Sequence, residues 1–289
     1  MESQENQYRW PKAEAVYPDR PGRSYALKRL RYRLRAFSHR GLIAQFEQFI
    51  NQHPFLVKLL NEHADYSYPL VYRFLDKRFN RKQRFQAICD NLRFLPEKLT
   101  ALSTPIYKTP LSFGVVIPDF EMTLSMTTHQ PMEGYWVLEL WHKPRNELVY
   151  LPTFAKLGES LLISVVQGPN FEGSKEMVKQ LTKTCYGLRP AYLMVETMKA
   201  LTKVLGFNQL LGIPQKYQNK SHFIQSSHYV VDYDAIFAES GGQLKDYWEL
   251  PLEIDRNLDD VPSKKRSMYR KRYAMLDDLA KVIEEKLEL

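Results

Sequence analysis

The spacing of apolar residues changes near Pro105, and this change constrains the fold more than any other feature of the sequence. Between residues 24 and 102, apolar side chains recur every three or four positions, as in Leu27, Leu30 and Leu34, which predicts amphipathic helices. After Pro105 they alternate or run together in short segments between turn residues, which predicts strands. Helices followed by strands and further helices indicate an α+β fold.

Three zones are predicted along the chain. Residues 1–24, rich in proline, arginine and tyrosine, are expected to form an extended leader, either laid on a domain or mobile. Residues 25–104 are expected to form a helical bundle, in which Asn80 caps the last helix and Pro96 interrupts it. Residues 105–289 are expected to form an α+β domain.

The order of expected strands and helices in the third zone predicts a mainly antiparallel sheet with helices covering one face. The expected meander strands are Leu111–Ile117, Met122–Thr128, Tyr135–His142, Glu147–Phe154 and Ser160–Gln167. Further elements are expected as helices at 174–187, 190–205, 232–239 and from 262 onward, and as strands at 208–213 and 247–254.

The net charge of +8 is local to the first third of the chain. Residues 1–100 hold 19 Lys and Arg against 10 Asp and Glu, whereas the remainder holds 22 against 23. A local surplus favours contact with an anionic membrane surface or an acidic protein partner. Nucleic acid is not the expected partner, because no recognised nucleic-acid module surrounds the basic residues.

The first basic segment, residues 20–40, carries eight Lys or Arg and no acid around the apolar row Leu27, Leu30, Leu34 and Phe37. Such a helix suits an anionic membrane or an acidic partner. It equally allows the row to pack on the core and leave a solvated basic face. The candidate surface residues are Lys28, Arg29, Arg31, Arg33 and Arg35.

The second basic segment opens the last helix with Lys264, Lys265, Arg266 and Arg270, and acidic residues follow towards its end. This order opposes the helix dipole, which favours acids first and bases last. The basic residues are therefore expected to pair with the acidic residues at 255, 259 and 260 or to bind an external anion.

Several strongly marked classes are unsupported. The sequence lacks the P-loop, dinucleotide-binding, nucleophile-elbow and HExxH signatures. Cys89 and Cys185 are predicted to be buried, unpaired thiols, and the seven scattered histidines give no zinc spacing, so no metal is predicted. The polar N-terminus and the lack of a long apolar run predict a cytoplasmic protein.

Two glycine turns are candidate anion or phosphate sites, Gln167-Gly168 after a strand and Gly187-Leu188-Arg189 before a helix. The alternative is structural, with Gly187 capping a helix and Arg189 satisfying local carbonyls. The weak acid–base candidates are Glu139, His142, His222 and His228. Strand alternation places Glu139 and His142 on opposite faces. The Asp232-Tyr233-Asp234 spacing suits a metal and sugar nucleotide, or simply the first turn of a helix.

Several of these motifs occur in one order that resembles the VirK/YbjX family of Gram-negative bacterial proteins. The matching segments are Gly187–Met194, Leu205-Gly206, Leu211–Ile213, Asp232–Asp234 with Gly241-Gly242, and Ser263–Asp277. The resemblance implies a cytoplasmic or inner-membrane-associated protein linked to virulence, envelope integrity and resistance to cationic antimicrobial peptides. It implies no settled enzymatic activity and no catalytic residues.

Two functions from different classes follow as hypotheses. The order of the meander, Gln167-Gly168, the helix start at Gly187–Pro190 and the next short strand resembles a GNAT-like acyltransferase, which would use acyl-CoA or an acyl carrier. Two consecutive helices where that fold usually has one depart from the pattern. The rival hypothesis is a non-enzymatic peripheral membrane or partner-binding protein that acts through the basic helix. The substrate and oligomeric state stay open.

Overall fold

The computed structural model describes residues 7–127, 130–219, 231–259 and 261–287, and its first part is helical. The elements of this part are α1 (Ala13–Val16), α2 (Ala26–Ser38), α3 (Arg40–Asn51), α4 (Pro54–Glu62), the 3₁₀ helix η1 (Ala64–Val71) and α5 (Arg81–Lys98). Asn80 caps α5, since its side chain accepts from the backbone N–H groups of Lys82 and Gln83. The predicted cap is confirmed.

An eight-stranded sheet follows, in the spatial order β1-β2-β3-β4-β5-β6-β8-β7. Its strands are β1 (Leu111–Ile117), β2 (Phe120–Met126), β3 (Trp136–His142), β4 (Glu147–Leu157), β5 (Ser160–Gln167), β6 (Leu210–Gly212), β7 (Gln243–Leu244) and β8 (Trp248–Leu250). All described pairs are antiparallel except β5 with β6. The predicted α+β class with a mainly antiparallel sheet is confirmed.

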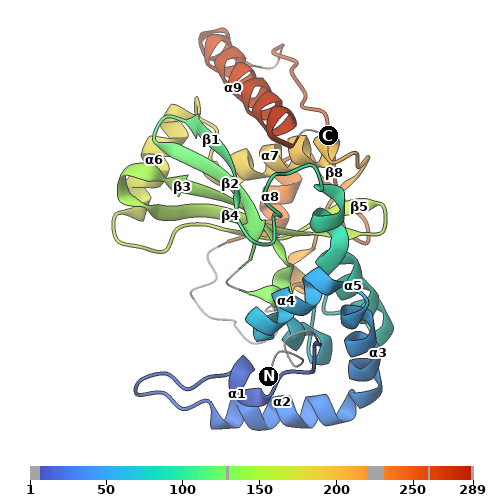
Figure 1. The fold of residues 1–289 in the computed structure, drawn as a ribbon. Helices are drawn as coiled ribbons and strands as arrows, with labels where there is room; N and C mark the ends of the chain where they lie inside the picture. The colour runs from blue at the N-terminus through green and yellow to red at the C-terminus, as the bar shows by residue number, and fades with distance from the viewer. Residues whose placement is uncertain (1–6, 128–129, 220–230, 260, 288–289) are drawn as a thin grey trace.

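Helices connect and cover this sheet. Parallel strands need a long crossover, and α6 (Ser174–Thr184) and α7 (Pro190–Val204) supply it between β5 and β6. The short α8 (Tyr233–Glu239) precedes β7, and α9 (Ser263–Leu287) packs on α7. Figure 1 shows α2 along one end of the molecule and α9 projecting at the opposite end.

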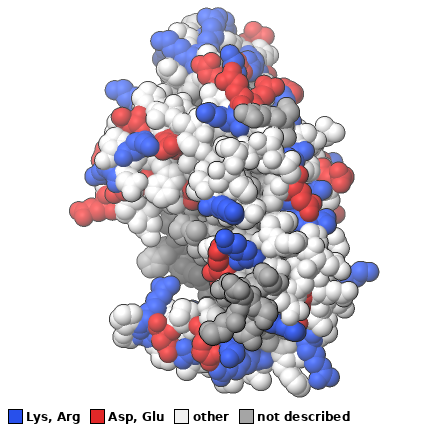
Figure 2. Space-filling view, in the orientation of Figure 1, with Lys and Arg blue, Asp and Glu red and all other residues white. Residues whose placement is uncertain are grey.

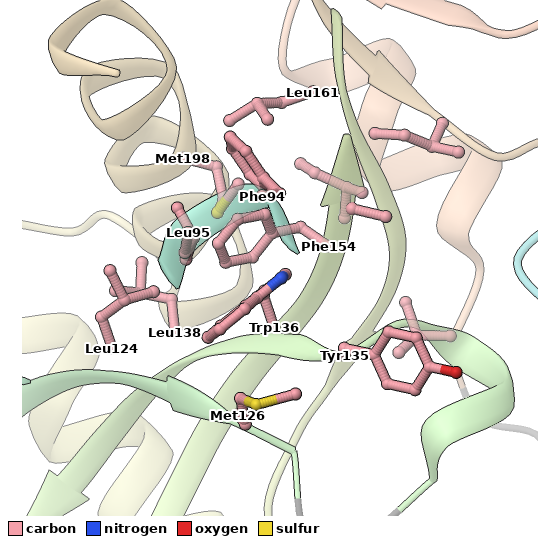
Figure 3. Packing of buried hydrophobic residues seen from close by; sticks show 14 of the residues in the cluster. Phe94, Leu95, Leu124, Met126, Tyr135, Trp136, Leu138, Phe154, Leu161 and Met198 are labelled. Carbon is pink, nitrogen blue, oxygen red and sulfur yellow. The ribbon is translucent and has the colours of Figure 1, made fainter. Parts of the chain in front are cut away.

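Apolar side chains from α5, α7 and the sheet meet in one core. Figure 3 shows Phe94 and Leu95 of α5 beside Trp136 and Phe154 of the sheet, with Met198 of α7 near them. All five are buried. Because interiors pack as densely as organic crystals, these contacts fix α5 firmly on one face of the sheet.

Asn91 of α5 takes the place of a missing strand. β3 begins at Trp136, opposite Phe154, so the β4 residue Lys156 lies beyond its end. The Asn91 side chain donates to the Lys156 carbonyl at 2.8 Å and accepts from the Lys156 N–H at 2.7 Å. The Trp136 indole N–H donates to the backbone carbonyl of Asn91 at 2.9 Å. One buried amide thus satisfies backbone groups that the sheet leaves unpaired.

Two further sequence expectations have clear outcomes. Pro96 does not interrupt α5, which continues to Lys98; the prediction was wrong because a proline so near the C-terminus removes only one hydrogen bond from a helix that packing holds. Cys89 and Cys185 are free and buried, as predicted. Burial raises the pKa of both thiols to about 12.

The replacement Asn91→Ala tests the joint between α5 and the sheet. It leaves the Lys156 N–H and C=O buried without partners, so we expect a loss of about 3 kcal/mol and a melting temperature lower by about 5–10 °C. Circular dichroism melting measures this, with Gln86→Ala, an exposed amide on the same helix, as the control. Equal melting of the two variants would contradict the role given to Asn91.

Candidate functional site

The apolar row of α2 faces outward. Leu27, Leu30, Leu34 and Phe37 are 58%, 51%, 62% and 73% exposed, and α2 lies along the end of the molecule with no described element beyond it (Figure 1). The interpretation in which this row packs on the core therefore fails. Exposed apolar side chains are ordinary when scattered singly, but a contiguous row is a mark of an interaction surface.

The inward face of α2 is the one that carries Tyr32, and it rests on the leader. Tyr32 is 2% exposed, and its hydroxyl donates to the Pro11 carbonyl at 2.8 Å. Its ring stacks on Trp10 with centroids 6.0 Å apart. Trp10 in turn contacts α3, since its backbone N–H donates to the Glu47 carboxylate at 2.7 Å. The leader thus supplies the contacts that orient the helix.

The five predicted basic residues of α2 fall into two groups. Arg29 pairs with Asp19 at 2.9 Å and Arg33 pairs with Glu14, and both acids come from the leader. Lys28, Arg31 and Arg35 form no ion pair with a carboxylate anywhere in the described chain. The cations available to an outside anion are therefore Lys28, Arg31 and Arg35.

The start of α9 is a second basic surface, at the opposite end from α2 (Figure 2). Arg266 donates to the backbone carbonyls of Val261 and Asp259, so it caps the preceding turn. Lys264, Lys265 and Arg270 are exposed. The two surfaces lie at opposite ends of the molecule, and one flat surface therefore contacts only one of them.

Gln167 and Gly168 stand at the end of β5. The Gln167 side chain donates to Glu133 at 3.0 Å, and a Cβ at Gly168 would lie 3.2 Å from the ring of Tyr150. A larger residue here would have to displace the tyrosine ring, which lies against the backbone. That contact accounts for Gly168 without a ligand.

Gly187 and Arg189 have neighbours of their own. Gly187 has a φ of +76°, and a Cβ there would meet Arg272 of α9 at 3.2 Å. Arg189 ion-pairs with Glu239 of α8 and donates to the Tyr192 hydroxyl at 2.7 Å. Arg189, which the sequence predicts as an anion-binding residue, is thus already paired with the Glu239 carboxylate.

Glu139 and His142 lie on opposite faces of β3. Glu139 pairs with Thr123 of β2, and His142 pairs with Phe120. Glu139 is 8% exposed and accepts from the Thr123 hydroxyl and the Trp141 indole, each at 3.2 Å. It is thus held within a satisfied network. His222 and His228 lie outside the described residues.

The two carboxylates of Asp232-Tyr233-Asp234 form structural hydrogen bonds at the start of α8. Asp232 caps the helix by accepting from the Ala235 N–H at 2.9 Å. Asp234 accepts from the Gln215 N–H at 3.0 Å and from the Trp248 indole at 2.7 Å. Across the described ranges, no three His, Cys, Asp or Glu side chains gather as a metal site would require.

No described helix combines the length and the hydropathy that crossing a bilayer demands.

Tyr68 of η1 and Tyr72, which directly follows η1, are the part of the site that the sequence did not single out. Tyr68 and Tyr72 lie beside α2, and the Arg35 guanidinium sits 3.8 Å from the Tyr72 ring centroid. The close spacing of Tyr66, Tyr68 and Tyr72 in the sequence was the available signal.

The comparisons with known proteins agree with the predicted family. The model of DUF535, described as a protein family of unknown function, matches residues 21–285. The chain belongs to this family. It is 25% identical over 279 residues to the uncharacterized protein YbjX of Escherichia coli, across 89% of this chain and 83% of YbjX. The resemblance to VirK/YbjX proteins is confirmed.

Nearer relatives come from two other bacteria. An uncharacterized protein of Haemophilus influenzae is 79% identical over 282 residues, which cover 98% of this chain and 97% of the relative. A Mannheimia haemolytica protein named "Membrane protein LapB" is 63% identical over 216 residues, or 75% of this chain and 96% of the relative. No solved structure matches.

Stability measurements test whether the α2 row lies outside the core. Leu34→Ala removes an exposed side chain, so we expect a change within about 0.5 kcal/mol. Leu60→Ala removes a side chain that is 1% exposed and should cost about 2–5 kcal/mol. Urea unfolding followed by circular dichroism compares the two. A loss at Leu34 as large as that at Leu60 would place the row in the core.

Proposed function

We propose that this protein attaches peripherally to an anionic membrane surface through α2. The observation that carries the proposal is the outward row Leu27, Leu30, Leu34 and Phe37, each more than half exposed, with unpaired bases beside it. A helix of this composition lies in the plane of the interface with its apolar face among the acyl chains.

The energies are sufficient for reversible binding. Removing four half-exposed apolar side chains from water stabilises the bound state by about 4 kcal/mol. Each base near an anionic lipid surface adds about 1 kcal/mol, and Lys28, Arg31 and Arg35 have no carboxylate partner in the described structure to offset this. The sum gives an attachment that salt weakens.

The α9 surface fits this role less well. Its cations are exposed, but none of the exposed large apolar side chains of the described chain belongs to α9. It offers charge without an apolar row, and the electrostatic attraction then lacks a burial contribution. The name of the Mannheimia haemolytica relative, "Membrane protein LapB", supports a membrane role. So does the envelope and virulence role that the VirK/YbjX resemblance implies, at the cytoplasmic leaflet of the inner membrane.

Liposome flotation tests the proposal. The wild type is expected to float with phosphatidylcholine vesicles that contain phosphatidylglycerol, and less so at high salt. The double variant Leu30→Gln, Leu34→Gln should lower partitioning about 30-fold, since each leucine contributes about 1 kcal/mol.

Two matched controls locate the surface. Val115→Gln changes another exposed apolar side chain, 60% exposed on β1, and Lys264→Gln with Lys265→Gln removes charge at the α9 end. Both should float as the wild type does. Wild-type protein that stays at the bottom of the gradient at low salt would refute membrane attachment and leave an acidic protein partner as the ligand of α2.

An acyltransferase module is a second candidate, and the β5–β6 junction favours it. The two strands pair in parallel only from Leu161 to Ile163, and β5 continues to Gln167. Beyond the pair, the Gln218 side chain donates to the Ser164 carbonyl at 3.0 Å. Pairing between β5 and β6 thus ends before Gln167-Gly168, the place where neighbouring strands of GNAT-like enzymes part around the cofactor.

The neighbours of Arg189 and Gly187 limit this candidate to Gln167 and Gly168. An incoming pyrophosphate would have to displace Glu239 from Arg189 and would meet Arg272 and Met268 over Gly187. The backbone at Gly168, close to Tyr150, is the remaining contact for acyl-CoA or an acyl carrier.

Isothermal titration with acetyl-CoA decides whether the junction binds a cofactor. On this candidate the wild type releases or absorbs heat with saturable binding, and Gly168→Val, whose side chain collides with Tyr150, loses it. Gly41→Ala in α3, where the added Cβ has no heavy atom within 4 Å, is the control at a distant position. No saturable heat with millimolar ligand would exclude the acyl-CoA candidate and leave the membrane proposal intact.

A further inference from the structure

A hollow of about 490 Å³ opens beside α2, between the leader and η1. Four of its lining residues are bases, and four are tyrosines. The bases are Arg20, Lys28, Arg31 and Arg35, and the tyrosines are Tyr17, Tyr25, Tyr68 and Tyr72. This combination suits an anion that carries hydroxyl groups or an ester.

The bases in the hollow are not neutralised. None of the four forms an ion pair with a carboxylate in the described chain, whereas Arg29 and Arg33 on the same helix do. Asp65 is the one acid among the described residues that line the hollow, and burial raises its pKa, which favours its uncharged form. The hollow therefore carries an excess of positive charge.

Aromatic contacts hold two of the bases in place. The Arg35 guanidinium lies 3.8 Å from the Tyr72 ring centroid, and its Nη1 donates to the Tyr68 hydroxyl at 3.4 Å. The Lys28 ammonium lies 4.7 Å from the Tyr25 ring centroid. A cation already positioned loses less conformational entropy when an anion binds.

The row of bases runs beside the apolar row. Lys28, Arg31 and Arg35 are spaced by three and four residues, so they share one side of α2. Each follows directly after Leu27, Leu30 or Leu34, and the two rows are therefore neighbours around the helix. A molecule bound by the bases has its remainder next to the leucines.

We propose that this hollow binds the terminal phosphate of a lipid headgroup, a phosphomonoester, while the apolar row of α2 enters the acyl region. The inference rests on the proposed membrane attachment and adds lipid selectivity to it. A phosphomonoester carries close to two negative charges and three acceptor oxygens, which match the arginine forks and the fixed ammonium. Free phosphate esters share this chemistry, and the neighbouring leucines favour the lipid.

Flotation with two anionic vesicles tests the selectivity. Phosphatidic acid presents a phosphomonoester and phosphatidylglycerol a diester, and both are mixed with phosphatidylcholine to equal surface potential. The wild type should bind the phosphatidic acid vesicles about tenfold more tightly. Arg31→Gln and Arg35→Gln should lose this preference, whereas Arg33→Gln, which removes the same charge from a base that pairs with Glu14, should keep it.

The two replacements differ in how much they can destabilise the fold. Arg35 packs on Tyr72, so a melting curve is measured for its variant. Arg31 is exposed, without a hydrogen bond or ion pair in the described chain, and its replacement should leave the fold unchanged. Equal binding to both vesicles by the wild type, or a preference that survives in Arg31→Gln and Arg35→Gln, would overturn the proposed site even though the protein floats.

Calorimetric titration with glycerol 3-phosphate separates the site from the membrane. Binding by the wild type that Arg31→Gln abolishes would support a phosphomonoester site, and binding with no flotation on either vesicle would refute the membrane attachment while assigning the hollow to a free phosphate ester. Absence of both flotation and glycerol 3-phosphate binding would overturn the site as well as the attachment.

Discussion

The contact on which the outer surface of this protein depends is the one between the leader and α2. The segment from Tyr8 to Asp19 lies against α3 and η1, where Tyr8 and Asn51 exchange backbone–side-chain hydrogen bonds. α2 rests on this segment through the side that carries Tyr32, whose hydroxyl donates to the Pro11 carbonyl, and its apolar row lies on the outside. A segment that looks like a loose extension in the sequence thereby decides which face of the helix a partner meets.

Local patterns predicted most of the architecture, because apolar period and turn residues act within a few positions of one another. The bounds expected for β1 and β5 match those of the structure, as do the starts of α6 and α7. The direction of the α2 row was not predictable in the same way. The period shows that one face of a helix is apolar, but the burial of that face depends on what packs beneath it. Here the packing segment comes from a stretch with almost no secondary structure.

The same limit applies to the charged residues. A count of bases between residues 20 and 40 treats all of them alike, yet Asp19 and Glu14, just outside that window, neutralise Arg29 and Arg33. Arg189 meets Glu239, fifty residues away, and Arg272 donates to the Tyr186 carbonyl from α9. These are tertiary contacts with no trace in local composition. The candidate site is therefore limited to the α2 cations without a carboxylate partner in the described chain, and it includes Tyr68 of η1 and Tyr72 directly after it.

The two cysteines have a practical consequence for the study of orientation. Both thiols are buried in the core, and their raised pKa keeps them protonated near neutrality. A maleimide dye therefore has no native competitor on the surface. A single cysteine placed at either end of the molecule becomes a selective labelling position, and an environment-sensitive fluorophore there would show directly which end is in contact with a vesicle.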